Sequence, residues 1–255
     1  MEIKFFADVS ALDHLPLETQ FQKVKESGYD GIQINMDKTI EGTSFQELLQ
    51  AFELGCIAQI QTSGKDVGEH LNSLREQFEQ SAELKPLLIN ALTGKDYFSF
   101  GENVQLLNEA MSLERKHGVQ ITHEMHRGHF SFAAHMMERY LSLLPDLKIA
   151  ANFSEWCAVA GSYLEDQQEA VSVAIKRSYH IKGKWHVVAP TPSEKESKEV
   201  RKYADEKFLY WWHRIIQYQD HKIPVLPITV PFKAKFLIGN SDLKMILGAR
   251  DTLLS

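Results

Sequence analysis

The sequence predicts a single-domain α/β protein in which eight parallel strands close into a (β/α)8 barrel, the TIM barrel architecture. Its 255 residues match the length of one such barrel. Short apolar runs alternate with amphipathic stretches, and a Gly or Pro follows most of the amphipathic stretches. Strands that alternate with helices at this spacing indicate parallel βαβ units. Eight such units favour a closed barrel over an open doubly wound sheet, so the predicted domain spans residues 1–255.

The elements are predicted from these patterns in chain order. The strands are Ile3–Asp8, Gly31–Asn35, Cys56–Ile60, Leu87–Asn90, Val119–Glu124, Leu147–Asn152, Tyr179–Val188 and Ile223–Val230. The helices are Leu17–Ser27, Phe45–Leu54, Val67–Leu84, Glu102–His117, Phe132–Leu144, Gln167–Ser178, Glu199–Gln219 and Ile238–Ser255. Pro224, Pro227 and Pro231 each remove a backbone donor, so the eighth strand is expected to be short or irregular.

Composition excludes several classes of protein. Apolar residues make up 44% of the chain and charged residues 24%, as in ordinary globular domains. The net charge of −6 provides no broad attraction to nucleic acids or anionic lipids, so neither is an expected partner. No secretory signal, membrane-spanning run or nucleotide-binding motif is recognised. Cys56 and Cys157 lie far apart without metal-ligand spacing, which favours a reduced, cytoplasmic protein.

The chemistry of a TIM barrel lies where its strands end. The densest polar run in this sequence, residues 123–129, follows the fifth strand. In it Glu124 can serve as base or ligand, and His126 as acid, base or hydrogen-bond donor. Arg127 can hold a carboxylate or phosphate with two hydrogen bonds. This run therefore predicts a site for a small polar anion, although a solvated loop with one buried ion pair is the alternative.

Several motifs resemble those of the sugar phosphate isomerase/epimerase group of xylose-isomerase-like TIM barrels. The motifs are Glu26–Ile32, Asn90–Phe100, Gly118–Val119, His123–Gly128, Pro145–Leu147, Asn152–Trp156, Tyr210–Ile215 and Thr229–Phe232. The resemblance implies a divalent cation held by Glu, Asp, His and Glu from strands five to eight. It also implies aldose–ketose isomerisation or epimerisation, in which carboxylates move a proton.

Only one of the four ligand positions that the resemblance implies keeps its residue. Glu124 matches the first Glu, whereas Asn152 stands where Asp is expected, Lys182 where His is expected and Pro231 where the last Glu is expected. One carboxylate and a neutral amide suit a hard cation poorly, and an ammonium group repels it. No bound metal or other cofactor is therefore expected, although Glu155 could partly compensate by turning inward.

Lys182 could replace the lost cation as a salt-bridge partner, as a carbonyl polariser or as a Schiff-base lysine. A Lys182–Glu124 pair that only closes the old cavity is the alternative. The candidate catalytic residues are Glu124, His126 and Lys182. The candidate substrate-binding residues are Asn90, Asp96, Arg127, Asn152, Glu155 and Trp156.

Three hypotheses follow for function. The first is an enzyme that acts on a small carbohydrate or hydroxy acid without a tightly bound metal. The second is a catalytically silent protein that binds a carbohydrate-like ligand in the same cavity. The third is a metal-dependent isomerase in which His180 or His186 replaces the expected His. The oligomeric state is left open, with a homodimer as one alternative.

Overall fold

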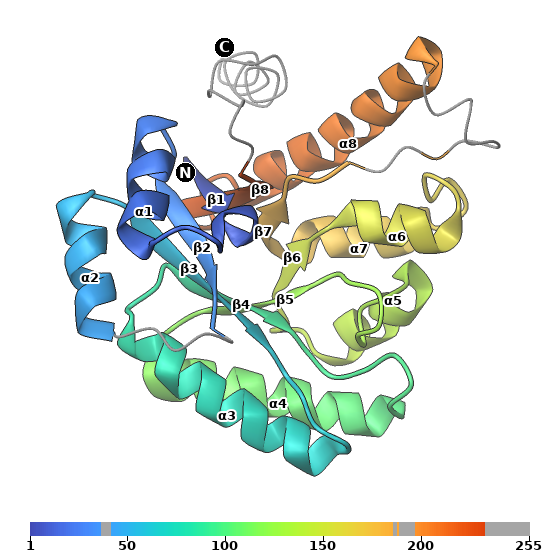
Figure 1. Cartoon of the computed structure of the whole chain (residues 1–255). Coiled ribbons are helices and arrows are strands. Elements are labelled where there is room, and N and C mark those ends of the chain that lie inside the picture. The colour runs from blue at the N-terminus through green and yellow to red at the C-terminus, as the bar shows by residue number, and fades with distance from the viewer. Residues whose placement is uncertain (37–41, 186–187, 189–196, 233–255) are drawn as a thin grey trace.

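The computed structural model describes residues 1–36, 42–185, 188 and 197–232 and contains a closed barrel of eight parallel strands with helices around it (Figure 1). The strands are β1 Glu2–Asp8, β2 Gly31–Asn35, β3 Gly55–Gln61, β4 Leu88–Leu92, β5 Ile121–Glu124, β6 Ile149–Ala151, β7 Ser178–Lys182 and β8 Val225–Pro231. The helices are α1 Leu17–Glu26, α2 Gly42–Ala51, α3 Val67–Glu83, α4 Phe100–His117, α5 Ala134–Leu143, α6 Phe153–Ala160, α7 Gln168–Arg177 and α8 Lys198–Gln219. The predicted fold class is confirmed.

Local sequence signals account for several helix boundaries. Asp66 caps α3 by accepting a hydrogen bond from the Glu69 N–H at 2.9 Å. Ser99 and Glu102 form a reciprocal capping box at the start of α4. Gly118 ends α4 in the left-handed conformation, with φ of 68°. The end of α4 at Gly118 leads directly into β5, which carries Glu124.

The eighth strand is the clearest error of the sequence prediction. It is seven residues long and pairs with β1 along its whole length, from Glu2 opposite Val225 to Asp8 opposite Pro231. Backbone groups of a parallel strand face its two neighbours alternately. The Thr229 carbonyl accepts from Gly183 on the β7 side, so Pro227 and Pro231 also direct their missing donors toward β7. On that side, β8 pairs with β7 through residues 228 and 229. The prolines lie outside this short pairing, so they remove few hydrogen bonds from the sheet.

Several boundaries differ from the prediction by one to three residues, and two differences are larger. Strand β7 ends at Lys182 rather than Val188, because the Lys184 N–H turns back to the Lys182 carbonyl at 2.8 Å. A helix that was not predicted, α6, begins directly after β6 and ends at Gly161, which has φ of 64°. The predicted last helix, residues 238–255, lies outside the described residues.

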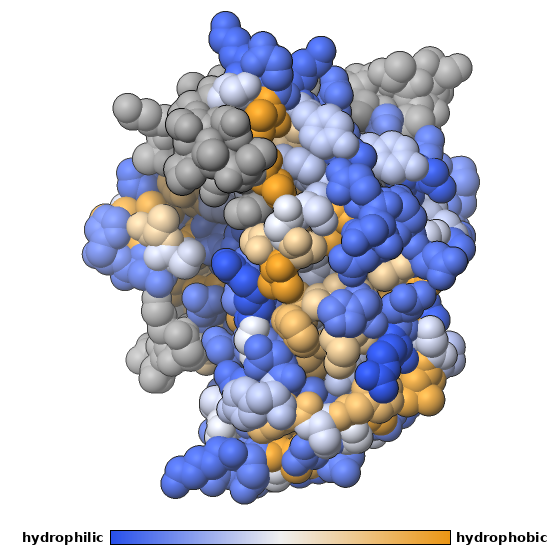
Figure 2. All heavy atoms as spheres, turned by 90° about the vertical axis from the view of Figure 1, so that its right-hand side faces the viewer, coloured by the Kyte–Doolittle hydropathy of each residue, from blue (hydrophilic) through white to orange (hydrophobic). Residues whose placement is uncertain are grey.

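None of the helices in the described part of the chain is both long and apolar enough to cross a bilayer. Large exposed apolar side chains occur singly, for example Tyr97, Leu143 and Val159. Figure 2 shows apolar side chains as an interrupted band among hydrophilic ones on the face that it presents.

An apolar floor closes the barrel interior beneath the polar residues. Phe6, Ile57 and Leu88, from β1, β3 and β4, form a small buried cluster of their own. The Phe6 ring lies against two glycines, since a Cβ at Gly31 would lie 2.3 Å from Phe6 Cε1 and one at Gly55 would lie 3.2 Å from it. Successive side chains of a strand alternate between its faces. Asp8, two residues after Phe6, therefore also faces the interior, one layer higher.

This packing predicts that Gly31→Ala destabilises the barrel by roughly 1–3 kcal/mol or more, because the new methyl group would meet Phe6 and the Gly55 carbonyl, the latter at 2.6 Å. Gly101→Ala is the matched control: its Cβ meets nothing within 4 Å, and alanine in helix α4 should stabilise by up to about 1 kcal/mol. Urea denaturation measures both free energies of unfolding. Equal effects of the two substitutions would contradict the close packing of β1 against β2.

Candidate active site

A polar cavity of about 210 Å³ lies at the carboxyl ends of the strands. Its lining residues are Asp8, Ser10, Gln33, Asn35, Gln59, Ile60, Gln61, Leu92, Glu124, His126, Lys182 and Lys184. Most of these follow alternate positions of β1, β2, β3, β5 and β7, which is why side chains from distant segments converge here. Two carboxylates, two ammonium groups and four carboxamides make the cavity polar without a large net charge.

Lys182 lies at the centre of this cavity's polar network. Its side chain is only 1% exposed, and its Nζ lies 3.7 Å from Glu124 Oε2 and 4.0 Å from Asp8 Oδ2. The ammonium group also donates a hydrogen bond to Gln33 Oε1 at 2.8 Å. A lysine on β7 thus joins β1, β2 and β5 across the barrel interior. The predicted proximity of Glu124 and Lys182 is confirmed.

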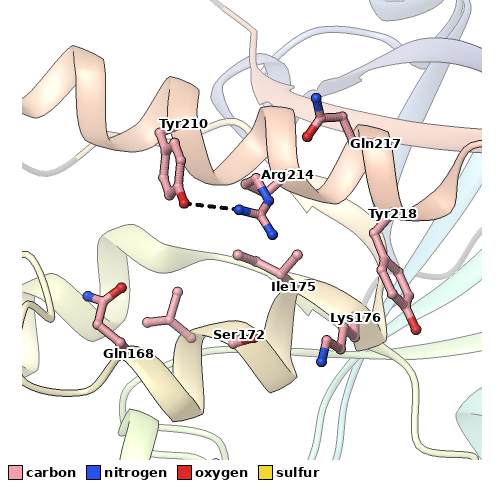
Figure 3. A pocket seen from close by; sticks show the side chains of 9 residues that line it. Gln168, Ser172, Ile175, Lys176, Tyr210, Arg214, Gln217 and Tyr218 are labelled. Atoms are coloured by element: carbon pink, nitrogen blue, oxygen red, sulfur yellow. Dashed lines mark hydrogen bonds between the residues drawn. The ribbon is translucent and has the colours of Figure 1, made fainter.

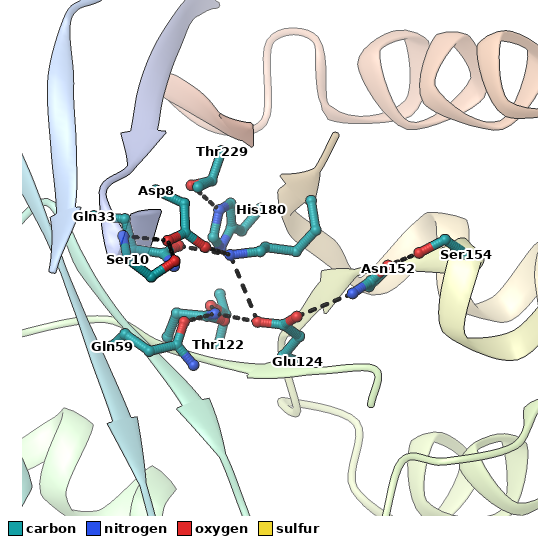
Figure 4. A network of polar contacts seen from close by, with 12 residues as sticks. Asp8, Ser10, Gln33, Gln59, Thr122, Glu124, Asn152, Ser154, His180 and Thr229 are labelled. Carbon is teal, nitrogen blue, oxygen red and sulfur yellow. Dashed lines mark hydrogen bonds and ion pairs between the residues drawn. The ribbon is translucent and has the colours of Figure 1, made fainter. Parts of the chain in front are cut away.

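Glu124 is held by two amides besides this lysine. Asn90 Nδ2 donates to Glu124 Oε2 at 2.7 Å, and Asn152 Nδ2 donates to Glu124 Oε1 at 3.0 Å. Asn152 Oδ1 in turn accepts from the Ser154 hydroxyl at 2.5 Å (Figure 4). Asn90 and Asn152 therefore position the carboxylate and are not among the residues that line the cavity.

The electrostatics of the network favour an ionised Glu124. Burial raises the pKa of this carboxyl, but the charges of Lys182 and Lys184 and the two amide hydrogen bonds outweigh burial and hold the pKa below its ordinary value. The pKa of Asp8 is also below its ordinary value. Burial raises it, but the charges of Lys182 and Lys184 and the hydrogen bonds from Ser10 lower it by more. Burial lowers the pKa of Lys182, whereas the charges of Glu124 and Asp8 oppose that effect.

His126 lines the same cavity and is half-buried. Its Nδ1 lies 2.7 Å from the Arg127 carbonyl oxygen. Because a carbonyl only accepts, Nδ1 must carry the hydrogen, and the neutral ring then has its lone pair on Nε2. The backbone thus selects the tautomer in which His126 can accept a proton through Nε2.

Four residues predicted as substrate contacts are not brought to the cavity. Arg127 Nε pairs with Glu155 Oε2 at 2.7 Å, and the Arg127 side chain is 60% exposed. Trp156 is buried against Phe153 and donates its Nε1–H to the Ser131 carbonyl at 2.8 Å. Asp96 is exposed on the loop after β4. Helix α6 explains two of these positions, because it directs Trp156 into the core and Glu155 toward Arg127.

Several residues that line the cavity were not predicted as site residues. Asp8, Gln33 and Gln59 line the cavity, and so does Lys184. Each of them faces the interior two residues away from another inward side chain, so period-two alternation along the strands could have identified them. A polar residue within a buried strand, such as Gln59 at 8% exposure, was the available signal.

The residues at the implied ligand positions do not fit a hard divalent cation. Both oxygens of Glu124 already accept amide hydrogens, Asn152 Oδ1 accepts from Ser154, and the Lys182 ammonium occupies the centre. Pro231, at the end of β8, has no ligating side-chain atom. Among the residues that the structure describes, no group of three or more His, Cys, Asp or Glu side chains is arranged to hold a metal.

His180 of the third hypothesis does not offer a substitute ligand. His180 is fully buried, and its Nε2 pairs with the Thr229 hydroxyl at 2.8 Å (Figure 4). Burial and the neighbouring Lys182 charge hold the pKa of His180 well below its ordinary value. His186 lies outside the described residues.

Comparison with solved structures gives the fold. The probable 3-DHS dehydratase AsbF from Bacillus anthracis is similar at a TM-score of 0.62 and 13% identity, covering 99% of each chain. A xylose isomerase-like TIM barrel protein from Mycobacterium smegmatis in complex with magnesium has a TM-score of 0.57 and 11% identity, covering 93% of this chain and 86% of that one. The fold is that of the xylose-isomerase-like TIM barrels.

Other solved structures that share the fold are described with different activities. A sugar phosphate isomerase/epimerase from Parabacteroides distasonis has a TM-score of 0.58 and 11% identity, covering 98% of this chain and 93% of that one. An AP endonuclease, family 2, from Brucella melitensis and an endonuclease IV from Thermus thermophilus share the fold as well. No protein-family model and no curated protein sequence matches the chain. At these identities the comparisons give the fold alone, so function must be argued from the cavity.

A second cavity, of about 300 Å³, lies on the outside of the barrel between α7 and α8. Arg214 Nη1 donates a hydrogen bond to the hydroxyl oxygen of Tyr210, one turn earlier in α8, at 3.2 Å (Figure 3). Tyr210 is 52% exposed, and this cavity has no buried charged side chain. The cavity at the strand ends is therefore the candidate active site.

The network predicts that Lys182→Met destabilises the protein by about 3 kcal/mol at neutral pH, because the buried Glu124 and the half-buried Asp8 lose their central counter-charge. The wild-type pKa of Glu124 is depressed, so its stabilisation is present above the unfolded pKa and is lost as pH falls through the folded pKa. In the variant, only Lys184 and the two amide hydrogen bonds still oppose burial, so the pKa of Glu124 rises. The deficit should therefore shrink as the pH falls and the carboxyl is protonated.

Urea denaturation at about pH 7.5 and about pH 5 measures this difference. Lys25→Met is the control, since the Lys25–Glu53 pair is exposed and its loss should change the free energy of unfolding by less than about 0.5 kcal/mol. A Lys182→Met variant as stable as this control would show that Lys182 does not neutralise the buried carboxylates.

Proposed function

We propose that the cavity binds a small carbohydrate or hydroxy acid, and that the chain acts on it by isomerase- or epimerase-type proton transfer without a tightly bound divalent cation. The observation that carries this proposal is the buried Lys182 ammonium, 3.7 Å from Glu124 and 4.0 Å from Asp8. Its positive charge takes the electrostatic role that the resemblance assigns to a metal, next to the carbonyl oxygen of the ligand.

The lining of the cavity supports a small, oxygen-rich ligand. Drug-sized ligands occupy cavities of about 300–1,000 Å³, and this one, at about 210 Å³, is smaller. Gln33, Asn35, Gln59 and Gln61 line it, and a carboxamide can both donate to and accept from a hydroxyl group. Such a lining suits a chain of a few hydroxylated carbons.

Electrostatics support the absence of a tightly bound metal. At about 4 Å and an effective dielectric constant of about 20, two like unit charges repel by roughly 4 kcal/mol, and a divalent cation doubles that cost. A cation placed on Glu124 would meet the Lys182 ammonium at about that separation. It would also have to displace the Asn90 and Asn152 hydrogen bonds.

His126 and Glu124 then have different roles. His126 lines the cavity with an Nε2 that is free of hydrogen in the neutral ring, which supports its action as the base or acid. Glu124 has a depressed pKa and is saturated with donors, so it holds the Lys182 charge in place. The same saturation favours the second candidate, a catalytically silent ligand-binding protein, because a donor-saturated Glu124 is a weak base.

Calorimetric titration with aldoses, ketoses and aldonates of three to six carbons tests the proposal. Any ligand that binds is then incubated in D₂O, and NMR follows deuterium incorporation at the carbon next to the carbonyl group. We expect exchange in the wild type, a loss of roughly 10²–10⁴-fold in His126→Ala, and no loss in His135→Ala, an exposed histidine of α5.

The outcomes separate the two candidates. Binding with exchange that depends on His126 supports the enzyme. Binding without exchange in the wild type contradicts the enzyme and supports the silent binding protein. If no member of the series binds, the cavity does not have the proposed ligand class and both candidates fail.

A further inference from the structure

The Lys182 ammonium has fewer hydrogen bonds than its burial requires. It carries three N–H donors, and within the described residues it makes a single hydrogen bond, to Gln33 Oε1 at 2.8 Å. The oxygens of Glu124 and Asp8, at 3.7 and 4.0 Å, lie beyond hydrogen-bonding distance. An ion pair with a purely structural role, at 1% exposure, normally has its donors satisfied. The unused donors belong to a nitrogen that lines the cavity.

We propose that Lys182 is a nucleophile that forms a protonated imine with the carbonyl carbon of a small aldehyde or ketone in the cavity. This inference rests on the proposed function for its ligand and adds a covalent step to it. Lys182 is correctly placed for such a step, because it ends β7 and lines the cavity. Figure 4 shows the polar side chains, Asp8, Gln33 and Glu124 among them, that converge there.

The step balances with the groups present. The ammonium transfers one proton to Asp8, whose Oδ2 lies 4.0 Å from Nζ, and the amine lone pair is freed. The nitrogen then bonds to the carbonyl carbon, the C=O π bond breaks, and the oxygen takes up that proton. A second amine proton joins the resulting hydroxyl group, which leaves as water while the C=N bond forms. An ammonium and a carbonyl thus become a protonated imine and one water, with no net change in charge.

This conservation of charge answers the objection that an ion-paired lysine is unreactive. The protonated imine carries the same positive charge at the same nitrogen as the ammonium. The two carboxylates that stabilise the ammonium therefore stabilise the product as well, and the fold keeps its central ion pair. Only the short-lived free amine lacks the charge.

The surroundings also favour the free amine as an intermediate. Burial lowers the pKa of Lys182, and the charge of Lys184, two residues further along the chain, acts in the same direction. Lys184 lines the same cavity. A second lysine beside the first thus lowers the cost of removing its proton.

Reductive trapping tests the inference. The full-length protein is incubated with limiting dihydroxyacetone or glycolaldehyde and sodium cyanoborohydride, which reduces a protonated imine to a stable secondary amine. Peptide mass mapping then compares Lys182 with Lys116, an exposed lysine that pairs with Glu79 at 3.5 Å. We expect Lys182 to be modified at least about tenfold faster than Lys116, despite its burial.

Lys182→Arg keeps a positive charge and cannot form an imine, so the fast modification should disappear while that of Lys116 is unchanged. Modification that follows exposure, with Lys116 faster than Lys182 in the wild type, would overturn the inference and needs no variant. Calorimetric binding of dihydroxyacetone without reductant is measured separately. Binding with an unreactive Lys182 would contradict the covalent step and leave the proposed function standing.

Discussion

A buried ammonium group needs counter-charges and acceptors, and this need organises the interior of the barrel. Lys182 draws Asp8 from β1 and Glu124 from β5 to within 4.0 Å, and Gln33 from β2 to 2.8 Å. Removing one partner of such a group costs several kcal/mol, because the remaining charge is left in a medium that solvates it poorly. The polar layer of the barrel is therefore one connected unit.

The charges of Lys182 and Glu124 determine which atom of each neighbouring amide faces them. An ammonium only donates and a carboxylate only accepts, so Gln33 turns its oxygen to Lys182 and Asn90 turns its nitrogen to Glu124. Asn90 Nδ2 also donates to Gln59 Oε1 at 2.8 Å, and its oxygen accepts from Thr122 at 3.2 Å. Within the described residues, the amide nitrogens of Gln33 and Gln59 therefore remain available to a ligand in the cavity. Two charged residues thus determine what the lining offers to a ligand.

Much of the fold was accessible from sequence, because apolar periodicity and helix-terminating Gly residues reflect local physics. The bounds of β2 were predicted without error. Strand β8 was not, since the side toward which a proline directs its missing donor depends on a neighbouring strand that sequence does not reveal. The Glu124–Lys182 pair was found through the resemblance of motifs. Asp8 was noted only as a strand end, because its role arises from a residue 174 positions away across the barrel.

The central claim, that Lys182 stands in place of a divalent cation, is tested most directly by Mn²⁺ titration of two proteins. The wild type is compared with the double variant Lys182→His, Asn152→Asp, which removes the ammonium and restores a carboxylate beside Glu124. A metal that binds the folded state raises the melting temperature as its concentration exceeds Kd. The account predicts such a rise in the double variant and none in the wild type. A clear rise in the wild type, or stoichiometric metal in the purified protein, would contradict it.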